Sequence, residues 1–135
     1  MQKNAGPEFH EGPPGNGIVL TARSQIGTPY RWGGDSAETG FDCSGLIWWV
    51  YRQNGYSLPR MTSDQIRAGE PVDVLRPGDI VFFRISSTGS LHAGIYTGRG
   101  TFIHSPKTGG AVREDSMEMA YWRSRFLTAR RILSI

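Results

Sequence analysis

The chain has 135 residues, enough for one domain with a substantial hydrophobic core. Its hydrophobic content of 38% and mean hydropathy of -0.37 are typical of a soluble globular protein, and no apolar segment approaches the roughly 18 residues that a membrane-spanning helix needs. The formal net charge is only +3. Because the basic residues are scattered, this charge does not indicate a nucleic-acid-binding protein.

The first 17 residues are rich in glycine and proline and lack apolar periodicity, so residues 1–17 are predicted to form a flexible lead or tether. Residues 18–135 are predicted to form a single domain. The N-terminus has no apolar segment typical of a signal peptide. The sequence is therefore compatible with a cytosolic protein and with an exported protein whose leader has been removed.

Two helices are expected in the first half of the domain. Apolar residues at helical spacing predict a helix over 18–26, ended by the glycine and proline that follow it. Residues 30–40 are predicted to form a loop. A second helix is predicted over 43–54, with Gly55 as its C-terminal stop. Because this helix is apolar nearly all round, it should be the central buried helix of the domain.

The second half is expected to be mostly strands. Residues 62–65 match a capping box and predict a short helix that ends at Gly69. The predicted strands are 80–83, 92–97, 101–105, 111–114 and 126–132, with a short turn or helix at 121–125. Helices first and strands later predict an α+β domain with an antiparallel sheet.

One predicted hairpin places two histidines on the same face of the sheet. If residues 98–100 form its loop, Gly94 faces His104, and His92, Gly94 and His104 share one side. His92 and His104 are then diagonal neighbours, about 7–8 Å apart at the backbone. A loop one residue longer or shorter would move one histidine to the other face.

Cys43 is the only cysteine, so the chain cannot form an internal disulfide. It stands at the predicted start of the central helix, where the partial positive charge of the helix favours a thiolate. His92 could serve as its base and His104 could hold the base in one tautomer. The Cys43 N–H and the Tyr30 hydroxyl are candidate donors to an oxyanion.

Other readings of these residues stay open. A lone cysteine beside apolar residues is usually an inert core residue, and a lone histidine in a strand is usually structural. Cys43, His92 and His104 could also supply three zinc ligands, although no paired spacing typical of a zinc site is present. The third histidine, His10, falls in the predicted lead and is expected to have no role.

Six segments occur in the same order as in the NlpC family of bacterial cell-wall cysteine peptidases, which the chain resembles over about residues 18–133. No single segment is decisive, but the ordered set is highly specific. The segments are Gly27-Thr28-Pro29-Tyr30-Arg31-Trp32-Gly33-Gly34, Phe41-Asp42-Cys43-Ser44-Gly45, Leu58-Pro59-Arg60, Arg76-Pro77-Gly78-Asp79-Ile80-Val81-Phe82-Phe83, His92-Ala93-Gly94-Ile95-Tyr96 and Phe102-Ile103-His104-Ser105.

The resemblance implies a papain-like fold, with helices packed on an antiparallel sheet and the nucleophile at the N-terminus of the central helix. It implies that Cys43 is the nucleophile, His92 the base and His104 the orienting residue. Tyr30 matches the family tyrosine near the oxyanion site. The substrate-binding residues that the resemblance implies are Arg31, Trp32, Asp42 and Ser44.

Family members hydrolyse amide bonds in peptidoglycan stem peptides without a metal or cofactor. The resemblance therefore implies a murein endopeptidase that cuts the D-Ala–diaminopimelate cross-link or the D-γ-glutamyl–diaminopimelate bond. Residues 29–34 and the C-terminal segment are most similar to the envelope lipoproteins that cut the cross-link. We expect a monomer that binds stem peptides and no nucleic acid, acting in the cell envelope or outside the cell, with a removed leader as one possible membrane tether.

Several alternatives share these features. The same catalytic domain occurs in phage tail components and in exported antibacterial effectors. The papain-like scaffold also serves amidases and acyltransferases with other substrates. A wall-binding module without turnover is the alternative outside the enzymes.

Overall fold

The computed structural model describes residues 15–85 and 89–132, and within these ranges most helices precede the strands of the main sheet. The helices are α1 (Gly15–Ser24), α2 (Cys43–Gln53), α3 (Thr62–Gln65) and α4 (Ala120–Arg123). The strands are β1 (Asp35–Ser36), β2 (Gly40–Phe41), β3 (Glu70–Pro71), β4 (Ile80–Arg84), β5 (Leu91–Tyr96), β6 (Thr101–His104), β7 (Arg113–Ser116) and β8 (Phe126–Arg131).

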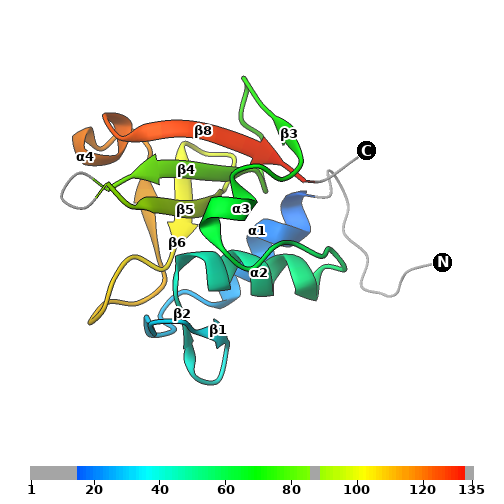
Figure 1. Ribbon diagram of the computed structural model, residues 1–135, viewed down its shortest axis with the longest axis vertical. Helices are drawn as coiled ribbons and strands as arrows, with labels where there is room; N and C mark the ends of the chain where they lie inside the picture. Colours follow the sequence, from blue (N-terminus) through cyan, green and yellow to red (C-terminus); the bar gives the residue numbers. More distant parts are fainter. Residues whose placement is uncertain (1–14, 86–88, 133–135) are drawn as a thin grey trace.

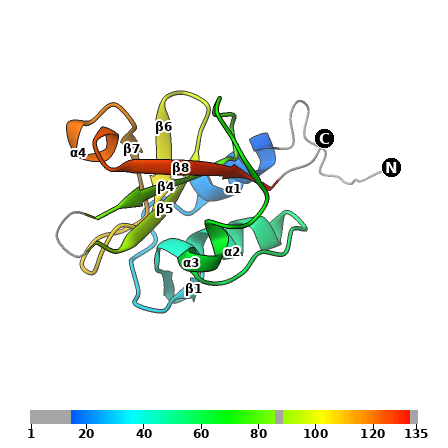
Figure 2. The same ribbon diagram turned by 45° about the horizontal axis from the view of Figure 1, so that its top comes forward.

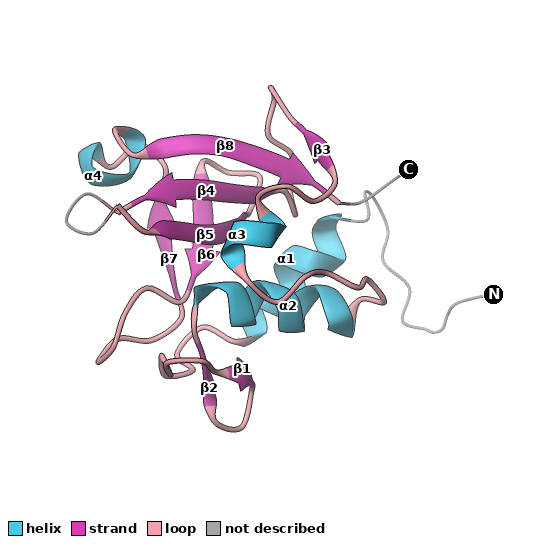
Figure 3. Ribbon diagram, viewed as in Figure 1, coloured by secondary structure: helices cyan, strands magenta, loops and turns pink. Residues whose placement is uncertain are grey.

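Six strands form one antiparallel sheet in the order β3-β8-β4-β5-β6-β7, which confirms the predicted sheet type. Figures 1 and 2 show α1, α2 and α3 on one face of this sheet. The small β1–β2 ribbon packs against α2 on the side away from the sheet. Figure 3 shows α4 at the end of the sheet where β8 begins. The central helix is therefore enclosed between the sheet and the ribbon.

The sheet separates two apolar clusters. Alternate residues of β4 point to opposite faces, so Ile80 and Phe82 contact the helices whereas Val81 and Phe83 contact the other cluster. All four are fully buried, because both faces of this strand are covered. The second cluster consists of Val81, Phe83, Phe102, Trp122 and Ala129.

The central helix α2 begins at the predicted residue, Cys43, and ends at Gln53, one residue before its predicted end. The Asp42 side chain caps it by accepting a hydrogen bond from the Gly45 N–H at 2.7 Å. Gly55 follows the helix with a φ of 87°, a left-handed conformation that glycine adopts without strain. Within the helix, the Tyr51 hydroxyl donates a hydrogen bond to the Gly78 carbonyl in the turn before β4. The Asp42 cap fixes the helix start, where Cys43 lies, and the other two contacts fix its C-terminal end.

The first helix differs from its prediction at both ends. It begins at Gly15, three residues early, so residues 15–17 belong to the helix and not to the predicted lead. A Cβ at Gly15 would lie 1.7 Å from the Pro77 carbonyl oxygen, so the helix start packs directly on the turn before β4. Residues 1–14, which include His10 and most of the predicted lead, lie outside the described residues, as do residues 86–88 after β4.

The predicted capping box at 62–65 is wrong. The N-cap of α3 is Met61, which makes no side-chain cap hydrogen bond. The Thr62 hydroxyl instead contacts the Cys43 sulfur. The Gln65 amide is buried and donates to the carbonyl oxygens of Ser44 and Pro59. Thr62 and Gln65, the first and last residues of the motif, therefore connect α3 to the start of α2.

Three further strand predictions need correction. The strand expected at 111–114 is observed two residues later, at 113–116. The expected loop at 30–40 contains part of the β1–β2 ribbon, and β3 was not predicted because it is only two residues long.

In the described part of the chain, no helix is long and apolar enough to cross a bilayer.

Candidate active site

The start of α2 presents the Cys43 thiol to α3 and to β5. Its sulfur lies 3.6 Å from the Thr62 hydroxyl oxygen, and the backbone N–H of Ala93 in β5 also interacts with it. Thr62 was not singled out from the sequence. The motif that contains it was read as a helix cap, and nothing in the local pattern indicates that its hydroxyl turns toward a distant residue.

Burial raises the pKa of the Cys43 thiol above its ordinary value, and the Asp42 carboxylate raises it further. Hydrogen bonds from Thr62 and from the backbone N–H groups of Ala93 and Ser44 lower the pKa but do not offset the burial. Burial therefore works against the thiolate that the helix terminus was expected to favour. The thiol needs a base to remove its proton.

The predicted hairpin register is confirmed. Ile95 pairs with Ile103 and Tyr96 with Phe102, so that the same register places Gly94 opposite His104. His92 Nε2 lies 2.7 Å from His104 Nδ1, and both side chains are buried. A Cβ at Gly94 would lie 2.6 Å from the Phe102 ring and 3.2 Å from His104 Cβ, so a side chain here would clash with Phe102 and crowd His104.

A carboxylate completes the hydrogen-bonded chain. Asp115 Oδ2 lies 2.7 Å from His104 Nε2 and also accepts a hydrogen bond from Arg113 Nε at 2.8 Å. Sequence reasoning missed Asp115. Placing the last hairpin strand at 113–116, paired with 101–104, would have put Asp115 and His104 on the same face of the sheet.

The three groups define the positions of their hydrogens. A carboxylate only accepts hydrogen bonds, so His104 Nε2 carries a hydrogen and donates it to Asp115. Burial lowers the pKa of His104 to about 4 and that of His92 to about 3, so both rings are neutral at pH 7. His104 Nδ1 is then an acceptor, and His92 Nε2 donates to it. His92 Nδ1 is left without a hydrogen, as a base requires.

Trp122 covers the two imidazoles from the second apolar cluster. Its ring stacks on His92 at 5.4 Å with 23° between the planes and meets His104 edge-on at 5.1 Å. Phe83 and Phe102 contact the same ring. Trp122 was predicted to lie in a short helix, but not to contact the histidines. It limits the access of water to the His92–His104 hydrogen bond.

Two of the predicted substrate-binding residues, Asp42 and Ser44, contact the half-buried Arg60 side chain beside Cys43. Arg60 donates to Ser44 Oγ at 2.8 Å and to Asp42 Oδ2 at 3.2 Å. It also donates to Asp35 Oδ2 at 3.3 Å. Only 5% of Ser44 is exposed. These side chains therefore hold the segment around Cys43 in place.

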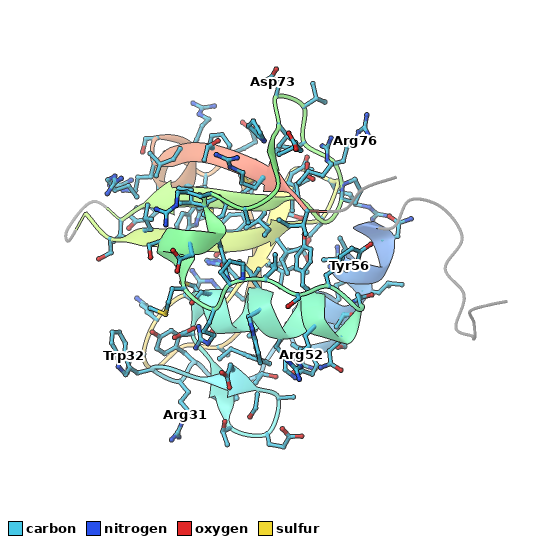
Figure 4. The ribbon with its side chains drawn as sticks, turned by 45° about the vertical axis from the view of Figure 1, so that its right-hand side comes forward. Arg31, Trp32, Arg52, Tyr56, Asp73 and Arg76 are labelled. Atoms are coloured by element: carbon cyan, nitrogen blue, oxygen red, sulfur yellow. The ribbon has the colours of Figure 1, made fainter. Side chains whose placement is uncertain are left out.

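The other predicted residues lie on the segment that leads to β1. Tyr30 pairs with Phe41, the residue before Asp42, in an isolated parallel bridge. Burial, and then the charges of Asp42 and Cys43, raise the pKa of the Tyr30 hydroxyl. Trp32 is 86% exposed. Figure 4 shows Arg31 and Trp32 projecting from the end of the molecule where α2 begins, whereas Arg52 and Tyr56 lie toward the other end of the helix. Arg31 and Trp32 can contact a ligand without any rearrangement of the core.

The geometry does not resemble a zinc site. Both ring nitrogens of His104 are occupied by His92 and Asp115. Within residues 15–85 and 89–132, no group of three or more His, Cys, Asp and Glu side chains is placed to hold a metal ion. The Cys43 thiol lies near β5, which carries the neutral His92 imidazole. The hydrogen-bonded chain through His104 to Asp115 determines which nitrogen of His92 has no hydrogen. This arrangement suits nucleophilic catalysis by general-base activation.

Comparison with known proteins finds similar domains. The chain is 41% identical over 116 residues to the murein DD-endopeptidase MepH of Escherichia coli strain K12, covering 82% of this chain and 43% of that protein. It is 36% identical over 137 residues to a gamma-D-glutamyl-L-lysine dipeptidyl-peptidase of Bacillus subtilis strain 168, covering 98% of this chain and 46% of that protein. The chain thus spans about half the length of the curated relatives it matches.

The fold agrees with these sequence matches. A crystal structure of an NlpC/P60 family protein from Bacillus cereus ATCC 10987 superposes with a TM-score of 0.83 at 34% identity, covering 90% of this chain and 41% of that one. The NlpC/P60 family profile matches residues 27–131, from the loop before Tyr30 to the end of β8. The fold is therefore of the papain-like type that the sequence predicted, and the chain belongs to the NlpC/P60 family.

Proposed function

We propose that this chain is a cysteine peptidase that hydrolyses amide bonds in peptidoglycan stem peptides. The observation that carries the proposal is the hydrogen-bonded chain from His92 through His104 to Asp115, which leaves His92 Nδ1 free as a base in the same region as the Cys43 thiol. Membership of the NlpC/P60 family and the peptidoglycan relatives support the choice of substrate.

The first half of the proposed reaction forms an acyl-enzyme. His92 Nδ1 takes the thiol proton as the Cys43 sulfur attacks the carbonyl carbon of the scissile amide. The backbone N–H of Cys43, in the first turn of α2, has no acceptor within the helix and can donate to the oxyanion. The Tyr30 hydroxyl is the second donor. The C–N bond breaks, and His92 gives its proton to the leaving amine.

The second half releases the product. Water attacks the thioester carbon while His92 Nδ1 takes one of its protons. The C–S bond then breaks, and the thiolate recovers the proton from His92. The products are a free amine and a carboxylic acid, and the enzyme returns to its resting thiol and neutral imidazole. No metal or cofactor takes part in this proposal.

Arg31 and Trp32 are proposed to bind the stem peptide. Stem peptides carry several carboxylates, which Arg31 could pair with, and Trp32 offers a large exposed ring beside the start of α2. Asp42 and Ser44 are proposed to border the position of the bound stem peptide, held there by Arg60. We also propose that the protein is a monomer acting in the cell envelope or outside the cell. Fractionation of cells that carry the native gene tests that location and any membrane tether.

The two curated relatives are named for activities on different bonds. We propose the D-Ala–diaminopimelate cross-link as the first candidate, because the higher identity is to the DD-endopeptidase. The γ-glutamyl bond is the second candidate, because the match to the dipeptidyl-peptidase covers 98% of this chain.

Purified diaminopimelate-type muropeptides distinguish these candidates by mass spectrometry. Conversion of cross-linked dimers to intact monomers identifies a cross-link endopeptidase. Shortening of the stem of monomers identifies cleavage of the γ-glutamyl bond. If neither pool changes while the protein is folded, the proposed function is wrong, and another amide substrate or a wall-binding module takes its place.

A further inference from the structure

We infer that Asp115 is a positioning residue that acts through His104 to keep the hydrogen off His92 Nδ1. The inference rests on the proposed function, because His92 is assumed to be the base. Asp115 lies in β7, two strands away from β5, which carries His92, and its side chain hydrogen-bonds to His104 and Arg113. Its role is therefore to select the state of the base rather than to react.

The two histidines can share their hydrogens in two ways. In one arrangement His104 carries its hydrogen on Nε2 and His92 on Nε2, which leaves His92 Nδ1 as the base. In the other, His104 carries its hydrogen on Nδ1 and donates it to His92 Nε2, so that the hydrogen of His92 must move to Nδ1. The short Nε2–Nδ1 contact of 2.7 Å ties the two choices together.

Asp115 favours the first arrangement, because its carboxylate can only accept. Its Oδ2 atom is 2.7 Å from His104 Nε2, and the His104 side chain is completely buried, so this carboxylate is the acceptor that the Nε2 hydrogen meets in the folded protein. The second arrangement would set the lone pair of His104 Nε2 against the carboxylate oxygen. Asp115 therefore fixes the active arrangement through the His104 ring, without contacting His92 itself.

Arg113 keeps Asp115 ready for this role. Its Nε donates to the same Oδ2 atom at 2.8 Å, while its own side chain is 53% exposed and stays hydrated. Burial raises the pKa of Asp115, but the hydrogen bonds from His104 and Arg113 outweigh it and lower the pKa below its ordinary value. The carboxylate is therefore ionised at neutral pH, and its orientation is fixed from two sides.

Histidine tautomers can be observed directly by long-range ¹H–¹⁵N NMR, without any substrate. We expect the wild-type protein to show both His92 and His104 with their hydrogens on Nε2. In Asp115→Leu, the form of His92 with hydrogen on Nδ1 should become populated. With a stem-peptide substrate, kcat of Asp115→Leu should fall by about 10²-fold to 10⁴-fold, the range typical of general-base contributions, and KM should change little.

Two variants make this test specific. Asp115→Asn keeps the shape of the side chain and removes its charge, so it should shift His92 in the same direction by less than Asp115→Leu, and it replaces that variant if leucine prevents folding. Glu114→Gln is the matched control. Glu114 is the neighbouring carboxylate on β7 but pairs with Arg23 and Thr101, and its loss should leave both tautomers unchanged.

The inference is wrong if the wild type carries a hydrogen on His92 Nδ1, or if Asp115→Leu and Asp115→Asn lower kcat while both tautomers stay as in the wild type. The second result would mean a purely structural role. Because the NMR readout needs no substrate, a protein that cuts no peptidoglycan can still show the tautomer shift. Failure of the inference and failure of the proposed function are therefore distinguishable.

Discussion

His92 Nε2 and His104 Nδ1 lie 2.7 Å apart, in two rings that are both buried beneath Trp122. Only one hydrogen can occupy this contact, and a charge on either ring would be placed in a site of low polarity next to the other ring. The pair is therefore held neutral, and the same burial that makes it a defined base makes it vulnerable to acid.

Stability should fall sharply below neutral pH. Burial lowers the pKa of His92 to about 3 and that of His104 to about 4, while an unfolded histidine titrates near its ordinary value of about 6.5. The unfolded chain therefore binds more protons below pH 6.5. The stability is complete above that pH and is lost as the pH falls, by about 2 kcal/mol for each histidine at pH 5.

Urea denaturation at pH 7.5 and pH 5 measures this loss. His92→Gln removes one of the two titrating rings, so the variant should lose about 2 kcal/mol less than the wild type between these pH values. An equal pH dependence in the two proteins would show that His92 is not a buried neutral base in the folded state.

Thr62 should control the reactivity of the nucleophile. Its hydroxyl lies 3.6 Å from the Cys43 sulfur and lowers the pKa of a thiol that burial raises. The rate at which iodoacetamide alkylates Cys43 rises with pH as the thiol loses its proton. In Thr62→Val, the midpoint of this rise should lie at a higher pH than in the wild type. Thr62→Ser keeps the hydroxyl and should keep the wild-type midpoint. Identical midpoints for valine and serine would exclude this role.

Arg60 should stabilise the segment that carries the nucleophile. Removing it in Arg60→Leu leaves the half-buried Asp42 carboxylate and the Ser44 hydroxyl without their partner. We expect a loss of about 1–3 kcal/mol in the free energy of unfolding and a lower kcat, since both residues adjoin Cys43.

The matched control for this change is Arg67→Leu. The Arg67–Asp64 pair is exposed at both ends, so its loss should change the free energy of unfolding by no more than about 0.5 kcal/mol. Equal effects of the two leucine variants in chemical denaturation would contradict a special role for Arg60.

Gly94 should not tolerate a side chain. The Cβ of Gly94→Ala would lie 2.6 Å from the Phe102 ring and 3.2 Å from His104 Cβ. We expect a loss of about 1–3 kcal/mol in stability and a displaced His104 ring. Combining it with Phe102→Leu removes the closest contact, so the two changes together should cost less than the sum of their separate costs. Strict additivity would mean that the contact with Phe102 is not the cause.

The features that follow from local rules were predictable. The length of the loop at 98–100 and the period of two in a strand place His92 and His104 on one face, and the hairpin has that register. The boundaries of α2 follow from its apolar sequence and from Gly55. Both rules act over a few neighbouring residues, so one sequence is enough to apply them.

The features that depend on distant contacts were missed. Asp115 was not predicted to be a site residue, because the strand expected at 111–114 lies two residues later. Only the pairing of β7 with β6 shows that the Asp115 side chain meets His104. Thr62 matched a capping pattern, yet its hydroxyl faces Cys43. The burial that raises the pKa of Cys43 was also missed, because helix position is visible in the sequence, whereas burial of the thiol depends on how α2 and α3 pack.

The most direct test of the proposed function compares the wild type with Cys43→Ala on purified cross-linked muropeptides, with products read by mass spectrometry. Circular dichroism and thermal unfolding of both proteins check that the variant is folded. We expect the wild type to release new amine and carboxyl ends and the folded variant to release none above background. Cleavage by folded Cys43→Ala at a rate close to that of the wild type would contradict catalysis by Cys43.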